Sequence, residues 1–96
     1  MIFFHNSLEE YDNVTYKADD AYIFDAYVSD YDFGAGVYLY AGDALLDYTT
    51  EKVSGEVYRF EGVIPSTVPV GNITFKLVTV NGGAKTIRDS FTARII

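Results

Sequence analysis

The sequence has no cysteine and no tryptophan, and its 96 residues include one histidine, one methionine and two prolines. Without cysteine the chain can form neither a disulfide framework nor a thiolate site. His5 is the only histidine, so neither a Ser-His-Asp triad nor a histidine-rich zinc site can be assembled elsewhere. The G-x-S-x-G pattern of a nucleophile elbow is also missing. We therefore expect no catalytic residues and no enzymatic activity.

Positive charge is scarce in the first third of the chain. Residues 1–32 hold eight acidic residues and one basic residue, whereas residues 33–96 hold six of each, so the first third accounts for the net charge of −7. Such a chain repels phosphate backbones, and its basic residues do not cluster with aromatic residues as in a nucleic-acid platform. We expect neither nucleic acid nor an anionic membrane as a partner.

Apolar residues are frequent, but they are not gathered into a long run. They make up 49% of the chain and include nine tyrosines and seven phenylalanines, which suffices for the core of one domain over residues 1–96. The apolar start, residues 1–4, is too short for a signal peptide, and no run approaches the about 20 residues that span a bilayer. We expect no membrane insertion and an irregular, mobile segment over residues 1–11.

The segment from Gly71 to Ile96 predicts a complete β-hairpin. Apolar and polar residues alternate on both sides of Asn81-Gly82-Gly83, whose residues tolerate the positive φ of a tight turn. The expected inward residues are Ile73, Phe75, Leu77, Phe91, Ala93 and Ile95.

Other short β-rich runs are separated by turn residues. We expect strands over residues 14–18, 22–29, 37–40, 45–49 and 56–64. Their inward residues include Phe24, Ala26, Val28, Tyr58, Phe60 and Ile64. About seven strands at this spacing predict an all-β protein, a two-sheet antiparallel sandwich with Greek-key connections.

Several motifs follow one another along the chain. They are Val28-Ser29-Asp30, Val37-Tyr38-Leu39-Tyr40, Tyr58-x-Phe60-x-Gly62-x-Ile64-Pro65, Val70-Gly71-Asn72-Ile73-Thr74-Phe75 and Asn81-Gly82-Gly83. Over residues 12–96 they resemble the immunoglobulin-like domains that are repeated in bacterial and archaeal surface proteins. The resemblance implies an immunoglobulin-like β-sandwich, although a fold does not convey a function. The antibody type of immunoglobulin domain does not fit, because the chain has neither a cysteine pair nor a tryptophan.

Acidic residues flank the strand expected over residues 22–29. Asp30 and Asp32 follow it in a loop, and oxygen-rich turns of this kind can bind Ca²⁺ between sandwich domains. Asp19 and Asp20 precede the strand, so they would lie about 25 Å away and cannot share an ion with that pair. Asp30 and Asp32 are therefore the candidate Ca²⁺ ligands, with solvated surface charge as the alternative. We expect no other cofactor.

The tyrosines suggest a contact surface. Because side chains alternate along a strand, Tyr38 and Tyr40 share one face. In an immunoglobulin-like arrangement, their strand pairs with the strand that carries Val78 and Val80 on the same outer face. Exposed apolar area of this kind is typical of a contact surface, and ordinary cross-strand packing is the alternative. Tyr38, Tyr40, Val78 and Val80 are therefore the predicted partner-binding residues.

These patterns favour a non-catalytic structural or adhesive module of a prokaryotic or viral protein. Such a module would be extracellular, on a cell surface or on a virion, and would contact a neighbouring domain or protein subunit. The second hypothesis is an accessory module of a secreted enzyme that binds carbohydrate or Ca²⁺. Association of copies in solution would support the first, whereas glycan binding or stabilisation by Ca²⁺ would support the second.

Overall fold

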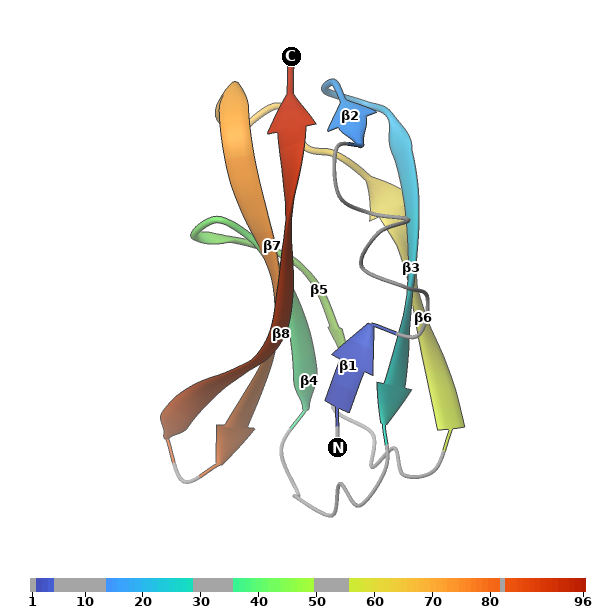
Figure 1. Cartoon of the computed structure of the whole chain (residues 1–96), viewed down its shortest axis with the longest axis vertical. Coiled ribbons are helices and arrows are strands. Elements are labelled where there is room, and N and C mark those ends of the chain that lie inside the picture. The colour runs from blue at the N-terminus through green and yellow to red at the C-terminus, as the bar shows by residue number, and fades with distance from the viewer. Residues whose placement is uncertain (1, 5–13, 29–35, 50–55, 82) are drawn as a thin grey trace.

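The chain folds into β-strands joined by turns and short connections. The computed structural model describes residues 2–4, 14–28, 36–49, 56–81 and 83–96. These ranges form no helix, but seven strands of three residues or more and one strand of two residues (Figure 1). The strands are β1 (Ile2–Phe4), β2 (Thr15–Tyr16), β3 (Ala21–Val28), β4 (Val37–Ala41), β5 (Ala44–Thr49), β6 (Glu56–Val63), β7 (Gly71–Asn81) and β8 (Ala84–Ile95). The prediction of an all-β protein is therefore confirmed.

The strands form two sheets. One has the order β1-β3-β6 and the other the order β2-β8-β7-β4-β5. In Figure 1, β7 and β8 lie on the left and β3 and β6 on the right. Neighbouring strands are antiparallel except for β2 and β8, which run parallel, with Thr15 opposite Arg94 and Tyr16 opposite Ile95. The prediction of purely antiparallel pairing is wrong at this pair.

Side-chain alternation gathers apolar residues from both sheets into one core. The Phe24 ring of β3 lies 5.4 Å from the Phe75 ring of β7 and 5.3 Å from the Phe91 ring of β8, measured between centroids. As predicted, the buried residues include Phe24, Ala26, Phe60, Ile64, Phe75, Leu77, Phe91, Ala93 and Ile95. Tyr58 and Ile73 pack against this core while partly exposed, and the side chain of Val28 lies outside the described residues.

The predicted hairpin is present. β7 and β8 pair from Gly71, opposite Ile95, to Asn81, opposite Ala84, so that only two residues form the loop. Gly83 in this loop has a φ of 83°, a conformation that glycine adopts without the clash of a Cβ atom. Asn81 is the last paired residue of β7.

The start of the chain differs from the prediction. Residues 2–4 form β1, which pairs antiparallel with β3, although we expected an irregular segment there. Phe4 is only 2% exposed, and its ring centroid lies 4.9 Å from that of Phe91. Its backbone N–H donates a hydrogen bond to Oδ2 of Asp89 at 2.9 Å. A three-residue strand is too short to show alternation, which is why the pattern missed it. Residues 5–11 lie outside the described residues.

Candidate functional site

A row of side chains crosses the outer face of the five-stranded sheet. Tyr48 on β5 is opposite Tyr38 on β4, which in turn is opposite Val78 on β7. Val78 is opposite Ile87 on β8. Because directly opposite residues point to the same side of a sheet, these four side chains form one continuous line, which we call the outer row. It contains two of the predicted partner-binding residues, Tyr38 and Val78.

The outer row is exposed at its ends and covered in its middle. Tyr48 is 52% and Ile87 is 59% exposed, whereas Val78 is only 4% exposed. The rings of Tyr38 and Tyr48 stack with their centroids 5.5 Å apart and an interplanar angle of 18°. The expectation that this face exposes Val78 is therefore wrong, because neighbouring side chains on the same face cover it. Val80 and Tyr38 are half-buried.

A bulge in β8 shapes this face. Leu77 is opposite Asp89, and the next residue, Val78, is opposite Ile87. Arg88 is therefore an extra residue in β8 without an opposite residue in β7.

The bulge reverses the alternation along β8. After it, Phe91 points into the core, whereas before it Ile87 and Lys85 lie on the outer face, although all three have odd numbers. The guanidinium of Arg88 is bound to the neighbouring strand β7, because its Nε donates a hydrogen bond to Oγ1 of Thr79 at 2.8 Å. Without this bulge, Lys85 and Ile87 would point inward.

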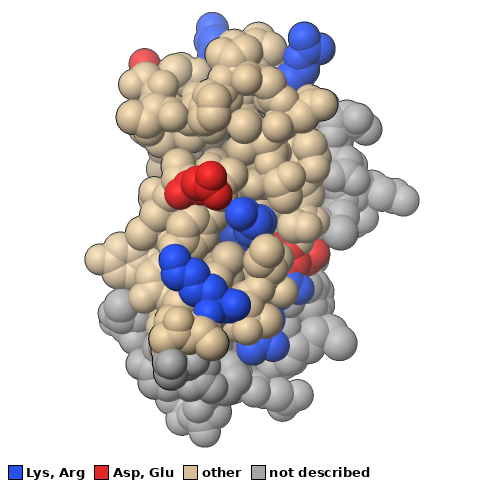
Figure 2. All heavy atoms as spheres, turned by 90° about the vertical axis from the view of Figure 1, so that its left-hand side faces the viewer, with Lys and Arg blue, Asp and Glu red and all other residues tan. Residues whose placement is uncertain are grey.

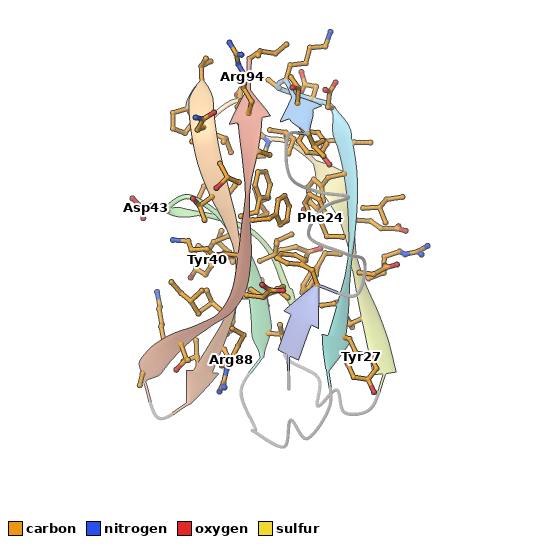
Figure 3. All side chains as sticks on the ribbon, viewed as in Figure 1. Phe24, Tyr27, Tyr40, Asp43, Arg88 and Arg94 are labelled. Carbon is orange, nitrogen blue, oxygen red and sulfur yellow. The ribbon has the colours of Figure 1, made fainter. Side chains whose placement is uncertain are left out.

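Beside the outer row the face contains an open hollow of about 320 Å³. It is lined by Tyr40, Gly42, Asp43, Lys76, Val78, Lys85 and Ile87. Figure 2, which looks onto this face, shows basic side chains gathered in its middle with acidic side chains near them. Figure 3 places Tyr40 and Asp43 on this side of the molecule, with Asp43 on the turn between β4 and β5. The hollow thus combines an apolar wall, made by Val78 and Ile87, with charged groups at its border.

Tyr40 lies next to both lysines of the hollow. Lys76 is directly opposite Tyr40 in the ladder between β7 and β4. Nζ of Lys85 donates a hydrogen bond to the Tyr40 hydroxyl at 3.4 Å and lies 5.5 Å from the centroid of its ring. The negative face of an aromatic ring attracts such a cation. These two contacts hold the Lys85 ammonium group at the border of the hollow.

Opposite charges border the hollow, and they form no ion pair with one another among the residues that the structure describes. Asp43 is exposed at the β4–β5 turn, where the N–H of Gly42 donates a hydrogen bond to the carbonyl oxygen of Thr74 at 2.8 Å. Lys85 is opposite Val80 on β7, six residues or about 20 Å along the strand from Thr74. Within the described ranges, neither Asp43 nor Lys76 takes part in an ion pair.

The other sheet carries an ion pair of its own. Nε of Arg59 on β6 lies 2.8 Å from Oδ1 of Asp25 on β3, and its Nη2 lies 3.2 Å from Oδ2. This hydrogen-bonded contact with the Asp25 carboxylate raises the pKa of the Arg59 guanidinium above its usual value. The pair joins β3 to β6 and has no part in the hollow.

The remaining predicted site residues fall outside the described ranges. These are Asp30 and Asp32, the candidate Ca²⁺ ligands, and His5. Among the residues that the structure does describe, no three histidine, cysteine, aspartate or glutamate side chains gather where they could hold a metal ion. The described strands and connections also include no helix with the length and apolarity to cross a membrane.

The sequence indicates only part of the hollow. Alternation places Tyr40, Val78 and Lys76 on the outer face, as found. It does not indicate Lys85 and Ile87, because unbroken alternation through β8 would turn both inward. No composition signal marks the bulge that turns them outward.

The chain was compared with models of known protein families, with curated proteins and with solved structures, and none of them matched. The face must therefore be interpreted from its own geometry and chemistry.

Proposed function

We propose that the chain has an immunoglobulin-like fold with Greek-key connections. In such domains strands A, B and E share one sheet and strands C, F and G the other, and variable-type domains add a strand beside C. By this correspondence β1, β3 and β6 would be A, B and E, and β4, β7 and β8 would be C, F and G. β5 would be the added strand. This strand order supports the resemblance in the sequence, while the parallel β2 makes the second sheet a mixed one.

We infer that this domain is a non-catalytic structural or adhesive module of a prokaryotic or viral surface protein. The observation that carries the proposal is the outer row, with Tyr48 and Ile87 more than half exposed on either side of Tyr38 and Val78. Tyrosine beside aliphatic residues is favoured in contact surfaces, because the ring buries apolar area while its hydroxyl stays hydrated. The row would contact a neighbouring domain or protein subunit, outside the cell or on a virion.

A carbohydrate-binding accessory module is the second candidate, and the hollow beside Tyr40 is the observation that favours it. Sugar rings stack on exposed aromatic faces through their C–H groups. Here the ammonium group of Lys85 donates a hydrogen bond to the Tyr40 hydroxyl and lies 5.5 Å from the ring centroid, so it occupies one border of the space in which a sugar would stack. Protein contact through the outer row is therefore the better-supported function. Binding of Ca²⁺ at Asp30 and Asp32 would belong to this second candidate.

Sedimentation velocity over a range of chain concentrations tests the contact. A double variant, Tyr48→Lys with Ile87→Lys, places charges at both exposed ends of the outer row. The matched control, Ile23→Lys with Val63→Lys, places the same charges on two residues of the other sheet that are each 55% exposed. We expect the wild type and the control to associate as concentration rises, and the outer-row variant to remain a monomer.

Two results would contradict the proposal. One is a wild type that stays monomeric up to about 1 mM, the range in which even weak protein contacts form. The other is a control variant that loses association as fully as the outer-row variant. Binding to a glycan array by a chain that does not associate would favour the carbohydrate-binding module instead.

A further inference from the structure

The hollow is bordered by opposite charges that form no ion pair with one another within the described residues. Asp43 belongs to the β4–β5 turn, whereas Lys76 and Lys85 project from β7 and β8. All three border the same opening, and the described residues offer no ion pair to Asp43 or Lys76. A surface with opposite charges at two ends of one opening is complementary to itself after a half-turn.

We propose that two copies of the chain pack outer face against outer face, about a two-fold axis through the hollow. Asp43 of each copy then lies against Lys85 of the other copy, so two equivalent ion pairs form at once. This pairing rests on the proposed function, because it names the partner of the outer face and the charges that align it. The outer row adds the apolar contact area beside these ion pairs.

The geometry favours a second copy over a small ligand. A small zwitterion could occupy the hollow, but it would leave the exposed ends of the outer row, Tyr48 and Ile87, in water. A second copy covers the hollow and the row together.

The size of the face predicts a weak contact. The molecule measures 37 by 26 by 18 Å, and Figure 1 looks down the shortest of these dimensions. The outer face is seen edge-on in this view, so its two sides are the longest and the shortest dimension, 37 and 18 Å. Such a face is at or below the about 800 Å² per partner that a standard interface buries. We expect a dimer that dissociates on dilution.

Reciprocal charge reversal tests the pairing by sedimentation velocity of the full chain. Asp43→Lys alone and Lys85→Glu alone each place like charges at both symmetric contacts, so the dissociation constant should rise about tenfold in each variant. The combined variant, Asp43→Lys with Lys85→Glu, restores opposite charges across the interface. Its dissociation constant should return to within about threefold of that of the wild type.

Two control variants make the same changes in net charge elsewhere. Arg94→Glu reverses an exposed charge on the same strand as Lys85, nine residues further along and outside the lining of the hollow. Glu61→Lys reverses an exposed charge on β6 of the other sheet. Both should leave the dissociation constant within about twofold of the wild type. Circular dichroism spectra of all variants should match that of the wild type, because every substituted side chain is exposed.

Several results would overturn the pairing. If the combined variant dissociates as readily as the two single variants, or if the controls weaken the dimer equally, Asp43 does not meet Lys85. Should the Tyr48→Lys with Ile87→Lys variant still abolish association in that case, the proposed function stands and only this pairing falls. A wild type that never associates rejects both. Amide chemical shifts of Gly42 and Lys85 that respond to free L-glutamate in the monomer would assign the hollow to a small ligand.

Discussion

Phe4→Ala is expected to lower the free energy of unfolding by about 4 kcal/mol. Phe4 is 2% exposed, and its ring meets Phe91 of β8 at 4.9 Å and Phe24 of β3 at 6.1 Å. A buried aromatic side chain removes roughly 150–250 Å² from water, which at about 25 cal/mol per Å² amounts to about 4–6 kcal/mol. That is an upper bound, because the unfolded chain already buries part of this area. Core truncations of phenylalanine to alanine cost about 3–5 kcal/mol.

Urea unfolding followed by circular dichroism measures this loss directly. A domain of this length is stable by about 5–14 kcal/mol, so the variant should remain folded with its midpoint at much lower urea concentration. In a thermal melt, the same loss corresponds to a decrease in Tm of roughly 15–30 °C. The matched control is Val70→Ala, which also truncates an apolar side chain but at a residue that is 77% exposed. It should change stability by less than about 0.5 kcal/mol.

The result decides whether β1 belongs to the folded domain. A loss below about 1 kcal/mol for Phe4→Ala would refute the reasoning, because a side chain of an irregular, solvated segment costs that little to remove. So small a loss would contradict both the pairing of β1 with β3 and the packing of Phe4 between the sheets.

Two further predictions concern Tyr22. Gly62→Ala should destabilise the domain by about 1–3 kcal/mol, since a Cβ atom there would lie 2.7 Å from the Tyr22 hydroxyl oxygen and 2.9 Å from its Cζ. Glu61→Ala, at the exposed neighbour, should leave the urea midpoint nearly unchanged, and equal midpoints for the two variants would contradict this close approach. Burial, followed by the negative charge of Asp47, raises the pKa of Tyr22 above its usual value. The folded chain therefore keeps this proton to higher pH than the unfolded chain, so the free energy of unfolding falls as the pH rises above about 10. Tyr22→Phe should lessen that fall in urea titrations between about pH 9 and pH 11, and an unchanged slope would exclude the shift.

Alternation predicted the core because most strands here are buried on one face only. Phe24 and Ala26 on β3, and Phe75 and Leu77 on β7, stand two residues apart and are all buried. The hairpin was predictable for a local reason as well, since glycines in its turn tolerate a positive φ. Both the alternation within a strand and the glycines of a turn can be recognised from a few neighbouring residues.

Other features depend on contacts that the local sequence does not encode. The three residues of β1 are too short to show a period, and they become a strand only through β3. The strand predicted over residues 14–18 is present only as the two residues of β2, which pair with β8. The bulge at Arg88 sits between ordinary strand residues, yet it turns Lys85 and Ile87 toward the outer face. For the same reason, the predicted surface included Tyr38 and Tyr40, whereas the hollow beside them could not be foreseen.

The parallel pair of β2 and β8 has a consequence for how the domain carries tension. The N–H of Arg94 donates a hydrogen bond to the carbonyl oxygen of Val14, and the N–H of Ile96 donates one to that of Tyr16, each at 2.9 Å. Because the strands run in the same direction, a pull on residue 14 away from residue 96 slides one strand along the other. Both hydrogen bonds then bear the load together, whereas the bonds of a hairpin pulled open at its ends break one after another. A pull between residues 14 and 96 therefore loads the two hydrogen bonds of β2 and β8 in shear.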